Sequence, residues 1–329
     1  MMASIREPDD DAIRDAAARL RRGDVVAFPT ETVYGIGAST FDAAAIRRVY
    51  ALKGRPDDNP LIAHVADADG AARLTDAWPV AATALAAAFW PGPLTIIVPR
   101  AAGVPDASTA GRATIAIRCP RHDVARRLLG AFGGPISAPS ANRSGHVSPT
   151  TAAHVASDFA DVATLLILDG GPCALGIEST VVDLTTPTAR VLRPGTVTVS
   201  AVRAVLGAVE APEIVGPSPS PGTRSRHYAP HTPARVIAPA GVASALASCG
   251  AGERAVVLGP AGARVEAPHQ LIVMPVDAAG YAAALYEGLR QADARGGTVL
   301  FIVDPSAAGD DDEESWRAVR DRLRRATTA

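Results

Sequence analysis

Lysine is nearly absent from this chain of 329 residues, since Lys53 is the only one and the other 31 basic side chains are arginines. Cysteine is scarce as well: Cys119, Cys173 and Cys249 are scattered and form no Cys-x-x-Cys pair. Such a set argues against a disulfide framework or a structural zinc site and fits a reducing compartment. No His–Cys arrangement supports Cys119 as a nucleophile, so we expect it to be a small buried hydrophobe.

Net charge and long apolar runs are also lacking. The formal charge is -2, which gives no sign of a large basic surface for nucleic acid. Residues 1–15 are acidic and lack the apolar core of a secretory signal, and no uninterrupted apolar run reaches membrane-spanning length. We therefore expect a cytoplasmic protein without a membrane partner.

Several catalytic signatures are missing too. The chain has no Ser-His-Asp order with a nucleophile elbow, no Walker loop and no Gly-x-Gly-x-x-Gly fingerprint in its last hundred residues. The polar residues that remain cluster where predicted strands end, which is where open sheets place ligands. They suit an anionic ligand, held by charge-assisted hydrogen bonds. These residues are Lys53, Arg55, Arg118, Arg193, Thr32, Ser140, Ser144 and Ser179.

The stretch from Lys53 to Asn59-Pro60 stands out among these clusters. It places the one lysine next to an arginine and then two prolines around an acidic turn, followed by the apolar run 61–65 with His64. A compact ammonium in a chain that otherwise uses arginine suggests a task that the guanidinium fork cannot perform. The alternative is a solvated helix C-terminus, where a cation favours the helix dipole.

The periodicity of the chain predicts an α/β protein with two domains. Residues 10–208 form the first domain, residues 209–233 a proline-rich extended linker, and residues 234–329 a second domain with a small parallel or mixed sheet. Predicted helices in the first domain are 9–22, 42–52, 123–130, 150–159 and 198–206, with two Ala-rich helices between them. Predicted strands there are 25–28, 61–65, 94–98, 114–117, 136–138, 165–168 and 190–193, and residues 176–183 are predicted to be a loop-to-strand transition. The second domain is predicted to have strands 235–238, 255–258, 271–274 and 298–303 and helices 241–248, 278–294 and 312–326.

Each polar cluster also has a plain structural interpretation. Ser140 and Asn142 could form a helix cap or an Asx-turn, and Ser179-Thr180 could reflect β-propensity alone. His64 could be a satisfied core histidine, and Tyr228 a packing anchor for the linker. Glu31 and Glu178 could be general bases, or they could have a capping or ion-pair role.

Six ordered motifs together resemble one known family. They are Pro-Thr-Glu-Thr-Val-Tyr-Gly at 29–35, Lys-x-Arg-Pro with Asn-Pro at 53–60, Trp-Pro-Gly-Pro-Leu-Thr at 90–95, Ser-Ala-Asn-x-Ser-Gly at 140–145, Glu-Ser-Thr-Val-Val-Asp at 178–183 and Arg-Pro-Gly at 193–195. The chain resembles the threonylcarbamoyl-AMP synthases, in their longer form with a C-terminal domain. The resemblance implies a YrdC-like domain with a twisted mixed sheet, followed by a smaller Rossmann-like α/β domain.

The resemblance also implies an activity and partners. L-Threonine, bicarbonate and ATP would give L-threonylcarbamoyladenylate, pyrophosphate and water, with Mg²⁺ accompanying ATP and no dedicated protein metal site. The product would feed the threonylcarbamoyladenosine modification next to the tRNA anticodon through a separate threonylcarbamoyl transferase complex, with at most a weak RNA contact by this chain. The rival interpretation is an RNA-binding or ribosome-maturation module. A carbamoyltransferase domain of the hydrogenase-maturation type would need accessory segments that the sequence lacks.

The matching motif positions imply roles for individual residues. Lys53 and Arg55 would be catalytic, with Lys53 beside the phosphates or holding bicarbonate. The threonine contacts would be Thr32, His64, Arg118, Ala138 (through its backbone) and Ser179. The ATP contacts would be Arg55, Asn59, Thr114, Ser140, Ser148, Arg193 and Tyr228, the last carried by the linker as a lid. Thr223 and Ser225 depart from the family pattern, which puts the closing of that lid in doubt.

Overall fold

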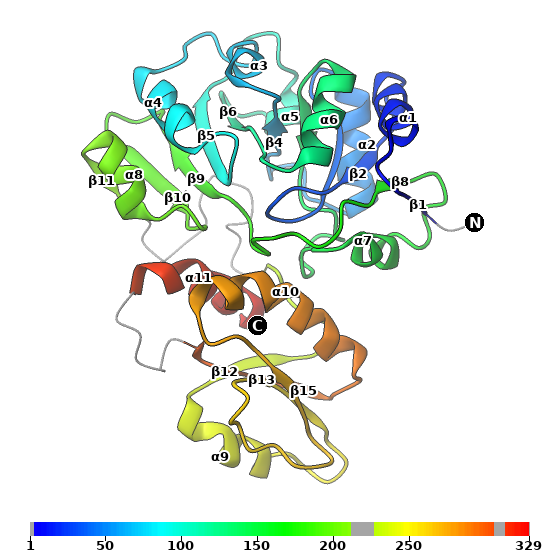
Figure 1. Cartoon of the computed structure of the whole chain (residues 1–329), viewed down its shortest axis with the longest axis vertical. Helices are drawn as coiled ribbons and strands as arrows, with labels where there is room; N and C mark the ends of the chain where they lie inside the picture. Colours follow the sequence, from blue (N-terminus) through cyan, green and yellow to red (C-terminus); the bar gives the residue numbers. More distant parts are fainter. Residues whose placement is uncertain (1–2, 212–226, 306–312, 329) are drawn as a thin grey trace. The chain divides into compact units, whose positions relative to one another are not determined.

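The computed structural model of the protein describes residues 3–211, 227–305 and 313–328 (Figure 1). These residues divide into two compact units. The first unit contains the described residues up to Ser144 and from Ser148 to residue 211. The second contains Gly145–Val147 and the described residues from 227 onward. Among the described residues, none of the helices combines the length and the hydropathy needed to cross a membrane.

The described part of the first unit is built on one mixed sheet of 11 strands. Five of the neighbouring strand pairs are parallel and five are antiparallel, as predicted for a twisted mixed sheet. In spatial order the strands are β1 (Ser4–Arg6), β8 (Leu166–Leu168), β2 (Val26–Phe28), β3 (Gly35–Ser39), β7 (Ile136–Ala138), β4 (Ile62–His64), β6 (Thr114–Arg118), β5 (Leu94–Pro99), β9 (Thr180–Asp183), β10 (Ala189–Arg193) and β11 (Val209–Glu210).

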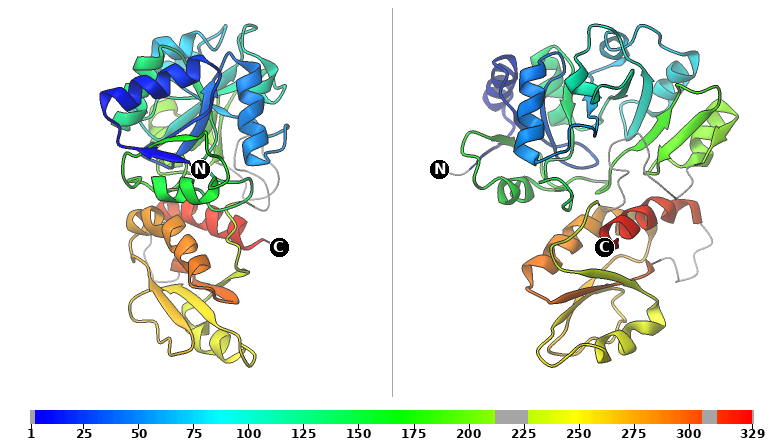
Figure 2. Two further views of the ribbon diagram at one scale, coloured as in Figure 1. Left: turned by 90° about the vertical axis from the view of Figure 1, so that its right-hand side faces the viewer. Right: turned by 180° about the vertical axis from the view of Figure 1, so that it is seen from behind.

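Helices cover both faces of the β1–β7 side of this sheet. Helices α1 (Asp10–Arg21) and α6 (Asp123–Phe132) pack on Val26, Phe28 and Leu166. Helices α2 (Ala43–Lys53) and α7 (Ala152–Asp158) pack on the opposite face, against Ala27 and Ile167. Figure 2 shows α1 and α2 on either side of the strands. Successive residues of β2 and β8 thus contact helices on opposite faces of the sheet, as expected for strands that are buried on both faces.

The other side of the sheet is asymmetric. Helices α4 (Val80–Phe89) and α8 (Val199–Leu206) pack on one face of β4, β5, β6 and β9, while α3 (Ala68–Ala72) adds Ala71 to the same cluster. The opposite face of these strands carries a small cluster of Ile62, Ile97, Ala116 and Val181. Polar residues two positions along the same strands therefore share this second face.

The C-terminus of α2 is set by Gly54. Its φ of 60° is in the left-handed region that glycine adopts without steric cost, so the helix ends directly after Lys53. At the start of α2 the Asp42 carboxylate accepts from the backbone N–H groups of Ala44 and Ala45. Both ends of the helix that carries the one lysine are therefore defined by local sequence.

The second unit is a parallel sheet with helices, in the order β12-β15-β13-β14. Its strands are β12 (Ala234–Ile237), β13 (Ala255–Gly259), β14 (Gln270–Val273) and β15 (Val299–Val303). Its helices are η1 (Pro239–Gly241), α9 (Val242–Ala247), α10 (Ala278–Ala294) and α11 (Glu313–Thr327). The predicted α/β class of both domains is confirmed.

A few elements differ from the prediction. Short strands β1, β3 and β11 and the short helix α5 (Asp106–Thr109) were not predicted. Strand β3 falls partly in a segment rich in glycines and hydroxyls that we expected to be a loop, and antiparallel pairing with β2 and β7 makes it a strand. Residues 212–226 of the predicted linker lie outside the described residues, as do Thr223 and Ser225. Val209 and Glu210, its first two residues, pair with β10 as β11.

Candidate active site

A row of aligned residues crosses four strands of the first unit. His64 of β4 is in register with Arg118 of β6, Arg118 with Thr95 of β5, and Thr95 with Val181 of β9. Directly aligned residues on neighbouring strands point to the same face of a sheet. The row therefore lies on the same face as the apolar cluster of Ile62, Ile97, Ala116 and Val181. Its polar side chains occupy one end of that face.

Arg118 is the buried cation of this row, with 3% of its surface exposed. Its Nη1 donates to the Thr32 hydroxyl at 2.8 Å and its Nε to the Gly92 carbonyl at 3.3 Å. Its Nη2 lies 2.8 Å from Oε1 of Glu31, an ion pair whose angles are not those of a hydrogen bond. Burial is the largest influence and raises the pKa of the Glu31 carboxyl, but the Arg118 charge and the hydrogen bonds to the carboxylate, including one from the Arg121 backbone N–H, together lower that pKa overall.

His64 is neutral in this environment. Burial lowers its pKa to about 3, and the Arg118 charge acts in the same direction. Its Nδ1 lies 3.3 Å from the carbonyl oxygen of Ile136, which can only accept, so Nδ1 carries the proton. Nε2 is then left with a lone pair and can accept a hydrogen bond from a ligand. One ring nitrogen of His64, Nδ1, is thus hydrogen-bonded in the core, as the structural interpretation predicted. The other, Nε2, is suited to bind a ligand.

Ser179 is held by two polar neighbours. Its hydroxyl lies 2.7 Å from that of Thr95 and accepts from Nη2 of Arg193 at 3.1 Å. Nε of Arg193 donates to the Ser179 carbonyl at 3.0 Å. Arg193 ends β10 and Ser179 directly precedes β9, so the antiparallel pairing of these strands brings a predicted ATP contact onto a predicted threonine contact.

Lys53 is buried, with 2% of its surface exposed, so the interpretation as a solvated helix end is wrong. Its Nζ donates to the carbonyl of Ser140 at 2.6 Å and to the carbonyl of Asn142. In return, the backbone N–H of Ser144 donates to the Lys53 carbonyl at 2.8 Å. The Ser140 hydroxyl also donates to Oδ1 of Asn142 at 2.5 Å, a bond between two side chains of this segment. A compact ammonium with three donors fits this pair of carbonyls, which explains why lysine stands here.

Arg55 and Asn59 form one rigid turn. Nε of Arg55 donates to the Asn59 carbonyl at 3.0 Å, and Nη2 donates to the Pro60 carbonyl at 2.8 Å. The Tyr50 hydroxyl donates to the same Asn59 carbonyl at 2.9 Å. Helix α2 ends at Lys53 and leads directly into this turn, so the buried Arg55 lies two residues after Lys53 in the sequence.

Comparisons with known proteins identify the family of this chain. Residues 18–195 match the family model described as "Telomere recombination", and residues 197–328 match the model of the C-terminal domain of threonylcarbamoyl-AMP synthases. The threonylcarbamoyl-AMP synthase of Pyrococcus abyssi is 45% identical over 230 residues, which are 68% of this chain and 67% of that relative. The chain belongs to the threonylcarbamoyl-AMP synthase family. The resemblance that the six motifs carry is thereby confirmed.

Other relatives agree with this. The Bacillus subtilis threonylcarbamoyl-AMP synthase is 46% identical over 233 residues, 68% of this chain and 66% of that relative. The matched segments thus span about two thirds of these curated relatives. A crystal structure of Sua5 from P. abyssi complexed with L-threonine has a TM-score of 0.88 at 35% identity and covers 99% of this chain and 97% of that chain. The similarity in fold therefore extends over both domains.

The remaining predicted contacts are placed more widely in this synthase-family fold. Ala138 ends β7 opposite Ile62, beside the strand of His64. Thr114 begins β6, four residues from Arg118, which is roughly 13 Å along a strand. The Ser148 hydroxyl donates to Oε1 of Glu178 at 2.7 Å.

Tyr228 belongs to the second unit. Its ring stacks on Tyr286 with centroids 5.5 Å apart, and Cζ of Arg322 lies 5.4 Å from its centroid. Its φ of 60° is unusual for a residue with a side chain. These contacts agree with the packing role that we considered for it, and its contact with ATP stays a prediction.

Sequence reasoning missed Thr95 and left Glu31 undecided. Thr95 is fully buried and bonds to Ser179, and its signal was the final position of the Trp-Pro-Gly-Pro-Leu-Thr motif. Glu31 is an ion-pair partner of Arg118 in this structure. Cys119 is buried, and burial raises the pKa of its thiol to about 11, as expected for a residue that packs.

Proposed function

We propose that the chain synthesises L-threonylcarbamoyladenylate from L-threonine, bicarbonate and ATP and releases pyrophosphate and water. One observation supports this most directly. The chain matches, over 99% of its length, a Sua5 structure complexed with L-threonine, and it carries a buried Arg118 held by Thr32 and Glu31. A buried guanidinium on a polar sheet face is the group that best binds the carboxylate of an amino acid.

Threonine would bind across the aligned row. A guanidinium has five N–H bonds. In Arg118 one donates to Thr32 and one to Gly92, Glu31 forms an ion pair with it, and the remaining N–H groups can bind the substrate carboxylate. Nε2 of His64 would accept a hydrogen bond from the substrate amine or hydroxyl. The Ser179 hydroxyl, oriented by Thr95, would provide a further polar contact.

The reaction would proceed in two steps. The threonine amine attacks bicarbonate carbon, forming an N–C bond and losing water, to give an N-carboxylate. A carboxylate oxygen then attacks the α-phosphorus of ATP, and the bond to the β,γ-pyrophosphate breaks. Lys53, Arg55 and Arg193 would position the phosphates and stabilise their charge, so that the protein supplies proximity and electrostatics rather than a covalent nucleophile.

Magnesium fits this proposal as a companion of ATP. Among the described residues, no group of three or more His, Cys, Asp or Glu side chains is placed to hold a metal. Glu178, bonded to the Ser148 hydroxyl, fits the one or two carboxylates that Mg²⁺ takes beside phosphates. Bound Mg²⁺ would neutralise phosphate charge as pyrophosphate leaves. Chelation of divalent cations should abolish turnover and leave the far-ultraviolet circular dichroism unchanged.

The product is a reactive mixed anhydride, so its use requires an acceptor. We propose a separate threonylcarbamoyl transferase complex that modifies the tRNA adenosine next to the anticodon, in the cytoplasm. A net charge of -2 supports at most a weak RNA contact by this chain.

The decisive experiment measures pyrophosphate release from ATP and bicarbonate with each amino acid in turn. Release should require bicarbonate and should be specific to threonine, with serine, which lacks its methyl group, and valine, which has a methyl group in place of its hydroxyl, as the matched controls. Release that is independent of the amino acid, or salt-sensitive RNA binding without threonine-dependent turnover, would overturn the proposal.

A further inference from the structure

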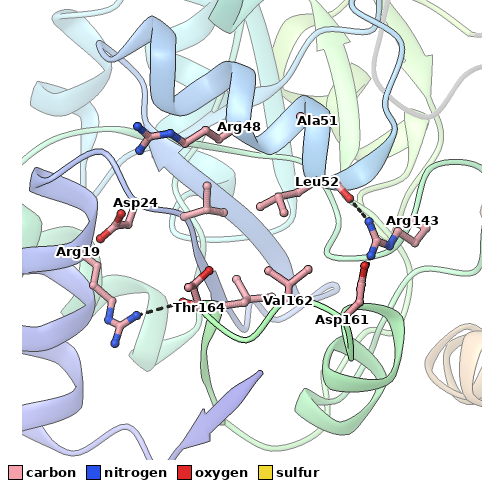
Figure 3. A pocket seen from close by; sticks show the side chains of 11 residues that line it. Arg19, Asp24, Arg48, Ala51, Leu52, Arg143, Asp161, Val162 and Thr164 are labelled. Atoms are coloured by element: carbon pink, nitrogen blue, oxygen red, sulfur yellow. Dashed lines mark hydrogen bonds and ion pairs between the residues drawn. The ribbon is translucent and has the colours of Figure 1, made fainter. Parts of the chain in front are cut away.

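Arg143 lies in the loop that carries Ser140 and Asn142, yet none of the predicted substrate contacts includes it. Its side chain lines a cavity of about 580 Å³ on the α2 and α7 side of the sheet, together with Leu52 and Asp161 (Figure 3). Its side chain is 35% exposed, so it is neither a buried site residue nor a free surface cation.

The guanidinium of Arg143 connects three segments. Its Nη1 donates to the carbonyl of Leu52, in the last turn of α2, and its Nε donates to the carbonyl of Asp158, the last residue of α7, at 3.1 Å. Its Nη2 forms an ion pair with Asp161, and its Cζ lies 4.8 Å from the ring centroid of Phe159. Helix C-termini leave carbonyls without intrahelical partners, so these bonds satisfy two helix ends at once.

These contacts adjoin the bonds of Lys53. Leu52 precedes Lys53, whose carbonyl accepts from Ser144 and whose ammonium donates to the carbonyls of Ser140 and Asn142. The end of α2 and the 140–144 loop are thus fastened to each other from one side by Lys53 and from the other side by Arg143. Removing Arg143 leaves the Lys53 bonds as the hydrogen bonds between these two segments that the described part of the chain shows.

We infer that Arg143 is a positioning residue for ATP: from the cavity side it holds α2 and the 140–144 loop so that Lys53 and Ser140 stay aligned for the phosphates. This inference rests on the proposed function. It adds a residue that acts through its neighbours and does not touch a substrate.

An electrostatic effect accompanies the geometric one. Burial lowers the pKa of the Lys53 ammonium well below its usual range, the charges of Arg55 and Arg143 lower it further, and Asp158 raises it. Neutralising residue 143 should therefore raise the pKa of Lys53. A role in stability alone has no such effect on the pH dependence of turnover.

The same cavity provides a matched control. Arg48 also lines it and lies on α2, one helical turn before Leu52, but its Nη1 donates to the Gly23 carbonyl at 2.6 Å (Figure 3). Arg48→Ala removes a guanidinium from the same helix and cavity without removing a bond to the Leu52 carbonyl. It reports on any general loosening of α2.

The experiment compares Arg143→Ala, Arg143→Lys, Asp161→Asn and Arg48→Ala in the full chain by threonine-dependent pyrophosphate release. Arg143→Ala should lower kcat/KM for ATP roughly 10-fold to 100-fold, the cost of a small misplacement of reacting groups, and leave KM for threonine within about twofold. Arg143→Lys should recover part of the loss, and Arg48→Ala should behave as wild type. Amide hydrogen exchange of the peptide that spans residues 139–145 should speed up in Arg143→Ala without any substrate.

Several outcomes would overturn the inference. They are an unchanged kcat/KM for ATP in folded Arg143→Ala, an equal loss in Arg48→Ala, or an equal rise of KM for both substrates. If wild type shows no threonine-dependent release, the proposed function fails instead. The hydrogen-exchange comparison of Arg143→Ala with Arg48→Ala then still decides whether Arg143 fastens the loop.

Discussion

The ion pair of Arg118 and Glu31 allows a quantitative prediction about the first unit. Both residues are buried, with 3% and 8% of their surfaces exposed, and Nη2 and Oε1 are 2.8 Å apart. Glu31→Gln keeps the size of the side chain and removes its charge. The cation of Arg118 then remains buried beside neutral groups, namely the glutamine amide, the Thr32 hydroxyl and the Gly92 carbonyl.

Breaking a buried pair by removing one partner typically costs about 3–5 kcal/mol, because the other charge is left uncompensated. We expect Glu31→Gln to lose about 3 kcal/mol of stability in the absence of threonine. If Arg118 binds the substrate carboxylate, threonine replaces the missing charge. Threonine should then raise the midpoint of unfolding more in Glu31→Gln than in wild type, since it stabilises the state in which Arg118 is compensated.

The assay can be restricted to the first unit because tryptophans are few. Trp78 and Trp90 lie in the first unit and Trp316 in the second, so a Trp316→Phe background leaves fluorescence from the first unit alone. Denaturant midpoints are measured with and without threonine between pH 7.5 and pH 4. The folded pKa of Glu31 lies below 4.5, so its stabilisation is present above pH 4.5 and is lost as the pH falls through the folded value. The difference in stability between wild type and Glu31→Gln should therefore begin to narrow as the pH falls below 4.5.

A double-mutant cycle provides the control. Arg118→Met and Glu31→Gln should each destabilise, and the double variant should be destabilised by less than their sum, with a coupling of about 1–3 kcal/mol. Wild-type stability of Glu31→Gln without threonine would refute the buried-charge reasoning. An equal effect of threonine on both proteins would refute the assignment of Arg118 as the carboxylate site.

Three further predictions concern neighbouring residues. Thr95→Val removes the hydroxyl that orients Ser179, a hydrogen bond of about 1 kcal/mol, and should raise KM for threonine roughly fivefold without changing KM for ATP in steady-state kinetics. His64 has a folded pKa of about 3, below its usual 6.5, so the unfolded chain binds a proton at a higher pH than the folded chain does. The free energy of unfolding should therefore fall as the pH drops from 6.5 toward 3. In denaturant titrations, His64→Gln should reduce the slope of that fall by about 1.4 kcal/mol per pH unit. Lys53→Ala releases the Ser140 carbonyl and should lower turnover far more than threonine affinity measured by calorimetry, whereas equal losses of both would contradict its predicted role.

Much of the fold could be predicted from local sequence. Asp9, Asp42 and Gly54 are cap residues that define the ends of α1 and α2, and the period of the apolar residues identified the main helices and strands. Strands β1, β3 and β11 could not be predicted in this way. Each has at most five residues, and β1 and β11 are edge strands whose pairing partners, β8 and β10, are set by the tertiary fold. Short strands of this kind depend on partner strands more than on their own propensity.

The candidate site shows the same division between what is local and what is not. Lys53 and Ser179 could be chosen from sequence because each lies within a distinctive motif, and Arg118 because it directly follows the predicted strand 114–117. Their partners could not, because Glu31 is 87 positions from Arg118 and Thr95 is 84 positions from Ser179. Only the order β4-β6-β5-β9 aligns His64 with Arg118 and places Thr95 beside Ser179. The supporting contacts, rather than the charged residues themselves, are therefore the part of this site that required a structure, and they are where substitutions should separate threonine binding from ATP binding.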